Sequence, residues 1–269
     1  MERAAVIVGA TGGIGSALVD AIAASGKFTA VHAISPVPYR GTGNISAHVA
    51  DINDEQSVQR VARVIATGPS ISLVVVASGV LHGSGVTPEK SLKTIDPTAL
   101  ATLFAVNAIG PALIAKHFVP LLPKQGRSVF AALSARVGSI EDNRLGGWYA
   151  YRASKAAPNQ LIRTLAVELK RKRSETITLA LHPGTVITEL SKPYRSEAST
   201  PRTFRPHEAA TIFSSSSTLP SLNNPDICSP GTGLAFRSDV RLRLSALRHR
   251  TNPLLRQGAA GRSSLRFRM

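Results

Sequence analysis

Cysteine and long apolar runs are both nearly absent from this sequence. Cys228 is the single cysteine in 269 residues, so no disulfide can form within the chain, which suits a reducing cytoplasm. No apolar run approaches the roughly 18 residues that a membrane helix needs, so we expect no membrane span. The apolar run 4–8 is short and leads straight into glycines, so we expect no secretory signal.

Acidic residues are also scarce, with 16 of them against 32 lysines and arginines and a net charge of +16. Half of that charge lies in residues 201–269, which hold 11 arginines, 3 acids and no lysine. Such a segment could bind nucleic acid through counterion release, but it interleaves few aromatic residues for base stacking. We therefore expect no nucleic-acid partner. The histidines lack metal-ligand spacing, and no metal site is predicted.

Strand-like and helix-like segments alternate as far as about residue 185. We expect strands at 4–10, 28–34, 45–52, 71–79, 127–135 and 176–184, and helices at 13–26, 54–68, 96–122 and 148–173. This alternation predicts an α/β, Rossmann-type, doubly wound parallel sheet with helices on both faces. Residues 1–210 would form this domain, and 211–269 would be an irregular, poorly ordered Arg/Ser-rich tail.

A glycine motif, "VGATGGIG", joins the first strand to the first helix. Gly9, Gly13 and Gly15 would allow a tight turn and let the backbone approach a pyrophosphate at the helix N-terminus. A plain glycine-rich turn is the alternative, and the strand–helix context favours a nucleotide site. Asp51 ends the third strand, where it could accept a hydrogen bond from an adenine or simply start a turn.

A tyrosine and a lysine lie one helical turn apart in "GGWYAYRASKAAPNQL". An unperturbed tyrosine has a pKa near 10, and a nearby ammonium lowers it by stabilising the phenolate. Tyr151 could then exchange a proton with a carbonyl oxygen, assisted by Lys155. The pair could also be a chance spacing. Pro158, three residues later, is expected to kink this helix.

The order of these features resembles the short-chain dehydrogenase/reductase family. A glycine turn, a strand-end Asp51, Asn107 in a long helix, a serine after the fifth strand and the Tyr151–Lys155 pair follow one another. The stretches "FAVNAIGPALIAKHF", "LSARVGSIEDNRLGGWYAYRASKAA" and "ALHPGTVIT" are similar to its C-factor-like (sniffer-like carbonyl reductase) branch. The resemblance covers about residues 4–210.

The resemblance implies a cofactor site and a catalytic site. The cofactor residues it implies are Gly9, Thr11, Gly13, Ile14 and Gly15 at the pyrophosphate, Asp51 and Ile52 at the adenine, Ser78 and Gly79 along the cofactor, and Pro183, Gly184 and Thr188 over the nicotinamide. The catalytic residues it implies are Asn107 in a proton relay, Ser134, Tyr151 as acid/base, and Lys155, which also binds the ribose.

The end of the second strand bears on the choice of cofactor. Members that use NAD usually carry an acid there for the ribose hydroxyls, whereas this chain has Ser35. Arg40 could meet a 2′-phosphate, or it could simply face water. We therefore favour NADP(H) over NAD(H).

Two residues depart from the family pattern near the catalytic site. The usual serine lies three residues before a glycine, where this chain has Ala135. Ser134 and Ser139 are the candidates to replace it, although neighbours on a strand point to opposite faces. Pro158 stands where the family tends to have leucine, and a kink there would displace Lys155.

The tail departs further, because the family pattern stops after "PHEAA" at 206–210. Relatives continue with a helix and a last strand of the type F-x-W-D-G. Codons for "CSPGTG" at 228–233, read from the third base, permit Leu/Phe-Ala-Trp-Asp-Gly. We therefore hypothesise a frameshift shortly after Ala210 and expect the sheet to lack its last strand.

The sequence thus predicts an NAD(P)(H)-dependent oxidoreductase that acts on a small carbonyl or alcohol. The alternative is a catalytically weak, C-factor-like protein that binds the cofactor and acts in signalling. The resemblance also implies a homodimer through the two long helices, in the cytoplasm.

Overall fold

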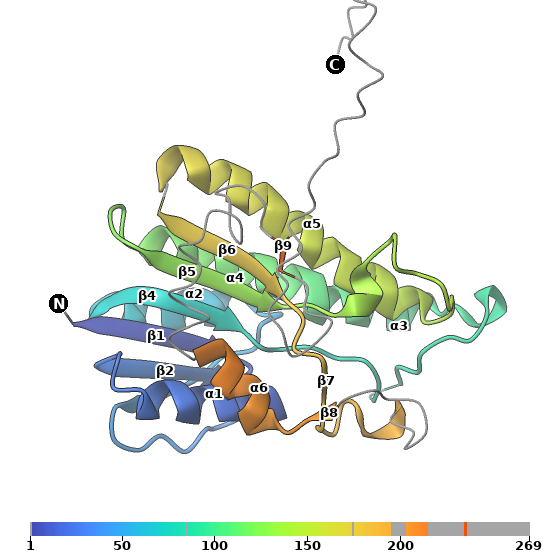
Figure 1. The fold of residues 1–269 in the computed structure, drawn as a ribbon, viewed down its shortest axis with the longest axis horizontal. Helices are drawn as coiled ribbons and strands as arrows, with labels where there is room; N and C mark the ends of the chain where they lie inside the picture. The colour runs from blue at the N-terminus through green and yellow to red at the C-terminus, as the bar shows by residue number, and fades with distance from the viewer. Residues whose placement is uncertain (1, 84, 174, 195–202, 215–233, 236–269) are drawn as a thin grey trace, which may run out of the picture.

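A parallel sheet between two layers of helices forms the centre of the molecule (Figure 1). The computed structural model describes residues 2–83, 85–173, 175–194, 203–214 and 234–235. Within these residues the strand order is β3-β2-β1-β4-β5-β6-β9. The strands are β1 Arg3–Val8, β2 Ala30–Ser35, β3 Ile45–Val49, β4 Ser70–Val76, β5 Ser128–Leu133, β6 Thr176–Leu181 and β9 Leu234–Ala235. The predicted doubly wound fold is confirmed.

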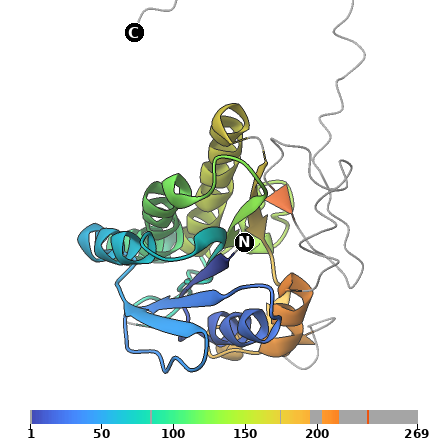
Figure 2. The same cartoon turned by 90° about the vertical axis from the view of Figure 1, so that its left-hand side faces the viewer.

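Helices cover both faces of the sheet, as expected (Figures 1 and 2). They are α1 Gly13–Ala24, α2 Glu55–Ile65, α3 Pro97–Phe104, α4 Gly110–Phe118, α5 Tyr149–Lys172 and α6 Pro206–Ser214. Helices α1 and α6 lie side by side on one face, and α2, α4 and α5 lie on the other. The strand order reverses between β1 and β4, and open α/β sheets bind their ligands at such a point.

Two hydrophobic clusters fill the space on either side of the sheet. Val6 of β1 faces the layer of α2, α4 and α5, where Phe118 is fully buried. Its neighbour Ile7 faces α1, where it packs in one cluster with Leu18. Successive strand residues point to opposite faces, so a strand covered on both sides has to be apolar throughout.

The long helix predicted at 96–122 is interrupted. Asp96 caps α3 by accepting a hydrogen bond from Ala99 N, and a π-helical turn, η2 (Ala105–Ile109), separates α3 from α4. By length and composition, the helical stretch 97–121 is apolar enough to cross a membrane, a test that a buried core helix also passes. Ile114 and Phe118 of this stretch are buried in the cluster on the sheet, and Leu103 is buried in the cluster that contains Tyr151.

The end of the sheet differs from the prediction. We expected no strand beyond β6, and this is wrong. The two residues of β9 pair in parallel with Ala180 and Leu181 of β6. Strand pairing uses main-chain groups, so an open edge can recruit a segment without a matching sequence. Helix α6 continues past residue 210 to Ser214. Most of the tail 211–269 lies outside the described residues. The predictions that it is disordered and that it arises from a frameshift therefore remain predictions.

Candidate active site

The turn between β1 and α1 brings the motif glycines together at the switch point. Gly9 has a φ of +83°, and a Cβ there would lie 2.6 Å from Ser78 N. A Cβ on Gly15 would lie only 2.0 Å from the Gly9 carbonyl oxygen. Helix α1 begins after Gly12, which makes no side-chain capping bond. The first N–H groups of α1 therefore point to a position where an anion can bind.

The chain that leaves β6 covers this turn. Pro183 and Gly184 lead into a short strand, β7 (Thr185–Val186), which pairs with β8 (Thr203–Phe204). Thr188 follows β7, and its Cγ2 is 2.8 Å from the position of a Cβ added to Gly13. Thr188 therefore lies against the glycine turn, and a side chain at Gly13 would require Thr188 to shift.

These residues fit a dinucleotide cofactor. The hydroxyl of Ser78, next to Gly9, is buried and has no hydrogen-bond partner, which a polar ligand would supply. Thr11 is exposed and Ile14 is half-buried at the rim of the turn. The glycine turn and the uncapped helix give a pyrophosphate both space and donors.

The predicted adenine residues follow β3. The Asp51 carboxylate accepts a hydrogen bond from Asn53 N at 2.8 Å, so this side chain does start a turn. It is also exposed, which leaves it accessible to a ligand. Ile52 is buried against Gly110 of α4, where a Cβ would lie 2.6 Å from Ile52 Cγ1.

The residues predicted to distinguish NADP from NAD follow β2. The Ser35 hydroxyl is buried and donates to the carbonyl of Val37 at 2.7 Å. It therefore shapes the turn after the strand. Arg40 is exposed beyond that turn, and its guanidinium is accessible from solvent.

Tyr151 and Lys155 lie in the first two turns of α5, and both are buried. Their exposed fractions are 7% and 4%. Lys155 Nζ donates to the carbonyl of Leu133, the last residue of β5, at 3.1 Å. A Cβ on Gly79, which follows β4, would lie 3.2 Å from the same ammonium group. The predicted pair thus lies at the carboxyl ends of β4 and β5, beside the glycine turn of β1.

The electrostatics of this pair differ from the prediction. Burial raises the pKa of Tyr151 to about 12, whereas Lys155 was expected to lower it. Burial also lowers the pKa of Lys155 to about 8. Desolvation disfavours the charged form of either group, and it is the cause of both shifts.

Asn107 connects the long helix to α5. It lies in the π-helical turn η2, a feature that is frequent at functional sites. Its side-chain amide donates to the Val80 carbonyl at 2.8 Å and to Ser154 Oγ at 3.0 Å. Ser154 Oγ donates in turn to the Tyr151 carbonyl at 2.9 Å. A hydrogen-bonded chain therefore joins Asn107 to the residue predicted to be the acid/base.

The serine candidates are engaged elsewhere. Ser134 Oγ donates to Asn159 Oδ1 at 2.7 Å, and Ser139 Oγ accepts from Asp142 N at 3.3 Å. Ala135 packs against the apolar cluster that contains Tyr151. The position of the usual serine therefore faces the site, but it carries no hydroxyl.

Sequence reasoning missed three polar side chains around α5. Glu89 is buried at the N-terminus of the helix, Ser154 links Asn107 to Tyr151, and Asn159 receives the Ser134 hydroxyl. Ser154 and Asn159 lie within four residues of Lys155 and could have been found by helical spacing. Glu89 is 61 residues away from its partner, and no local pattern indicates that contact.

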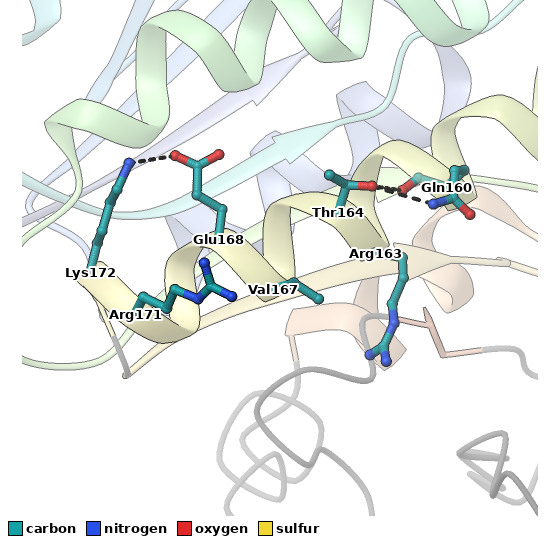
Figure 3. Close-up of a pocket in the computed structure, with 7 residues that line it drawn as sticks. All are labelled: Gln160, Arg163, Thr164, Val167, Glu168, Arg171 and Lys172. Atoms are coloured by element: carbon teal, nitrogen blue, oxygen red, sulfur yellow. Dashed lines mark hydrogen bonds and ion pairs between the residues drawn. The ribbon is translucent and has the colours of Figure 1, made fainter. Parts of the chain in front are cut away.

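A separate hollow lies on the outer face of the C-terminal half of α5 (Figure 3). It is lined by Gln160, Arg163, Thr164, Val167, Glu168, Arg171 and Lys172. Lys172 Nζ forms an ion pair with Glu168 at 2.7 Å. Neither the predicted catalytic pair nor the glycine turn contributes to this hollow, so it is not the candidate active site.

Comparison with protein families and curated proteins points to one group. The profile described as short chain dehydrogenase matches residues 3–199. C-signal of Myxococcus xanthus is 35% identical over 103 residues, 38% of this chain and 61% of that protein. The 1-hydroxy-2-glutathionyl-2-methyl-3-butene dehydrogenase of Rhodococcus sp. is 31% identical over 150 residues, 55% and 62% of the two chains. The chain thus spans less than two thirds of the length of both relatives.

Solved structures share the fold at low sequence identity. An NADPH-bound carbonyl reductase from chicken fatty liver superposes with a TM-score of 0.70 at 22% identity, covering 87% of this chain and 91% of that one. The carbonyl reductase Sniffer of D. melanogaster gives 0.68 at 20% identity, covering 87% and 96%.

Proposed function

Because the chain belongs to the short chain dehydrogenase family, we propose that it is an NAD(P)(H)-dependent oxidoreductase that interconverts a small carbonyl compound and its alcohol. The observation that carries this proposal is the position of the buried Tyr151–Lys155 pair. It lies beside Gly79 and the end of β5, next to the uncapped N-terminus of α1. The proposed acid/base and the proposed pyrophosphate site therefore lie at the same edge of the sheet.

Each residue has a defined part in this reaction. The nicotinamide, when bound, supplies hydride to the carbonyl carbon or accepts it from the alcohol. Tyr151 donates its phenolic proton to the carbonyl oxygen, and in the reverse direction the phenolate removes the alcohol proton. Lys155 stabilises that phenolate and binds the ribose hydroxyls. Asn107 holds η2 against Val80 and so supports the route by which Tyr151 is reprotonated.

The turnover test uses two tyrosines of the same helix. Tyr151→Phe removes the proposed acid/base and is expected to lower kcat on a panel of small aldehydes and ketones by about 100-fold or more. Tyr149→Phe is the matched control, because Tyr149 is 41% exposed and lies two residues earlier in the first turn of the same helix. Equal turnover of the two variants would contradict the assignment of Tyr151.

The proposed cofactor is NADP(H), because no acid follows β2 and Arg40 is exposed there. Binding is measured by quenching of Trp148, the only tryptophan. Arg40→Ala is expected to weaken NADPH binding about tenfold and to leave NADH binding unchanged. Arg63→Ala, at an exposed arginine on α2, is the control. Equal losses for both cofactors would remove the proposed phosphate contact.

We further propose that the protein is a cytoplasmic homodimer that buries the outer faces of α4 and α5. Leu161 and Val167 of α5 are 43% and 44% exposed, so covering these apolar side chains with a partner subunit would stabilise the dimer. Sedimentation of the full chain is expected to give twice the monomer mass. Val167→Glu is expected to shift the protein to monomer, and a monomeric wild type would refute this assembly.

A second candidate function is cofactor binding with little turnover, as in a signalling protein. Ala135 favours it, because the site lacks the hydroxyl that would bind the substrate oxygen. Saturable Trp148 quenching without turnover of any carbonyl would support this candidate. Turnover that disappears in Tyr151→Phe would exclude it.

A further inference from the structure

Helix α5 begins without a cap from its own sequence. Trp148 precedes its first residue with a φ of +53°, and the Trp148 side chain makes no capping hydrogen bond. The N–H groups of a first helical turn have no intrahelical acceptor. Ala150 and Tyr151 both belong to that turn, and Ala150 is completely buried. The proposed acid/base therefore stands on a helix end that needs an acceptor from elsewhere.

Glu89 supplies this acceptor from the loop that follows β4. Its side chain is buried, with an overall exposure of 4%. Both carboxylate oxygens lie 3.3 Å from Ala150 N, which donates to them. The main-chain carbonyl of Glu89 also accepts a hydrogen bond from Trp148 N, at 2.6 Å. One residue thus binds the last amide before α5 and an amide inside its first turn.

The chemistry of this contact favours a carboxylate. The N-terminus of a helix carries a partial positive charge, and an acid there is stabilised by the helix dipole as well as by the N–H donors. A buried carboxylate without such donors would be costly. The turn itself is held by Arg152, which donates to the carbonyls of Gly147 and Gly146 at 2.9 and 3.1 Å. The start of α5 is therefore fixed from two sides.

We propose that Glu89 is a positioning residue, which sets the location of the Tyr151 hydroxyl by fixing the first turn of α5. This inference rests on the proposed role of Tyr151 as acid/base. Glu89 does not touch the reacting atoms in this account. Its contribution is geometric, because a proton donor displaced by about 1 Å can lose about 100-fold in rate.

The test compares two substitutions of similar size. Glu89→Gln keeps a side-chain oxygen that can accept from Ala150 N, whereas Glu89→Met fills the space without an acceptor. We expect Glu89→Met to lower kcat about 10- to 100-fold, with the Kd for NADPH, read from Trp148 quenching, unchanged. Glu89→Gln is expected to retain kcat within about threefold of the wild type.

The matched control removes a cap from another helix. Asp54 caps α2 by accepting from Gln56 N at 3.0 Å, and α2 carries none of the proposed site residues. Asp54→Ala is expected to lower Tm but to leave kcat at saturating NADPH unchanged. A merely structural Glu89 would behave in the same way, so Glu89→Met with reduced Tm and wild-type kcat would overturn the proposal.

Two further variants keep the outcome decisive. If Glu89→Met does not fold, Glu89→Asp withdraws the acceptor by one methylene and keeps the charge, and wild-type kcat in that variant would overturn the proposal. Tyr151→Phe separates this inference from the proposed function. Full turnover of Tyr151→Phe would mean that the function assigned to Tyr151 has failed, whatever the Glu89 variants show.

Discussion

At the scale of single residues, burial determines the protonation of the proposed catalytic pair. Tyr151 and Lys155 are one helical turn apart, yet the ammonium group is directed to the carbonyl of Leu133. Desolvation moves the two pKa values apart, with Tyr151 raised to about 12 and Lys155 lowered to about 8, and favours the neutral form of each. The protein therefore loses stability by keeping an ammonium group in this site at neutral pH.

Lys155→Met should stabilise the protein while abolishing turnover. Between pH 8 and 10.5 the unfolded chain keeps a proton that folded Lys155 has released, so wild-type stability rises with pH across this window. The variant has no buried ammonium group to desolvate, so its free energy of unfolding should rise by about 1–3 kcal/mol at pH 7 and should depend less on pH. Urea unfolding from pH 7 to 10.5 measures both effects. A less stable variant with an unchanged pH slope would contradict this reasoning.

Ala135→Ser should increase turnover. Ala135 packs against the cluster that contains Tyr151, so a hydroxyl there would donate to the oxygen of a bound carbonyl. Removing one such donor costs roughly 100- to 1,000-fold in kcat, and we expect a gain of about tenfold or more from adding one here. Ser134→Ala is the paired control, since that hydroxyl binds Asn159; it should lower Tm and leave kcat nearly unchanged. The reverse pattern would assign catalysis to Ser134.

At the scale of elements, α5 tolerates the proline in its interior. Pro158 is buried within a helix that runs from Tyr149 to Lys172 without interruption. Asn159, the next residue, accepts from Ser134 Oγ and donates to the Gly138 carbonyl at 3.3 Å. A Cβ on Gly138 would lie 2.5 Å from the carbonyl oxygen of Lys155, so the loop after β5 packs tightly on this turn. These contacts hold Lys155 in place beside the proline.

Pro158→Ala is therefore expected to stabilise α5 without moving the site. The substitution restores the N–H that would bond the Ser154 carbonyl, and a proline inside a helix costs about 3 kcal/mol relative to alanine. We expect a gain of about 1–2 kcal/mol, because the lost ring packing offsets part of it. Pro97→Ala, at the first position of α3, should give no gain. Chemical denaturation of the two variants makes the comparison.

At the scale of the whole molecule, two buried histidines make the stability of the fold depend on pH. His32 of β2 and His182 after β6 both have their pKa lowered to about 4, mainly by burial. The charge of His48 lowers the pKa of His32 further, and the charge of Arg136 lowers the pKa of His182 further. Each favours folding in its neutral form. Their contribution is complete above the unfolded value of 6.5 and is lost as pH falls toward 4.

The Tm should therefore decline from pH 7 to pH 4.5. The double variant His32→Leu/His182→Leu should show a shallower decline, because neither position then takes up a proton on unfolding. His207→Leu, at an exposed histidine of α6, should leave the slope as in the wild type. Differential scanning calorimetry at several pH values gives the slopes, and identical slopes for all three proteins would refute the assignment.

The sequence by itself determined the fold class and predicted the principal residues of the candidate site. Apolar runs alternating with helical segments require a parallel sheet covered on both faces, and parallel strands bring their carboxyl ends to one edge. The glycine turn and the Tyr151–Lys155 pair could therefore be proposed from the residues, whereas Asn107 was implied only by the family resemblance. Helical spacing places Tyr151 and Lys155 on one face, and the motif context shows where they belong.

Only the tertiary structure decided what those side chains bind. Contacts such as Glu89 with Ala150 join residues far apart in the chain, and no local pattern records them. The direction of the Ser134 hydroxyl, the pKa of Tyr151 and the pairing of β9 with β6 depend on burial and packing. Desolvation and hydrogen-bond geometry arise only when separate segments pack together. The sequence therefore shows which chemical groups are present, and the tertiary structure determines their pKa values and their hydrogen-bond partners.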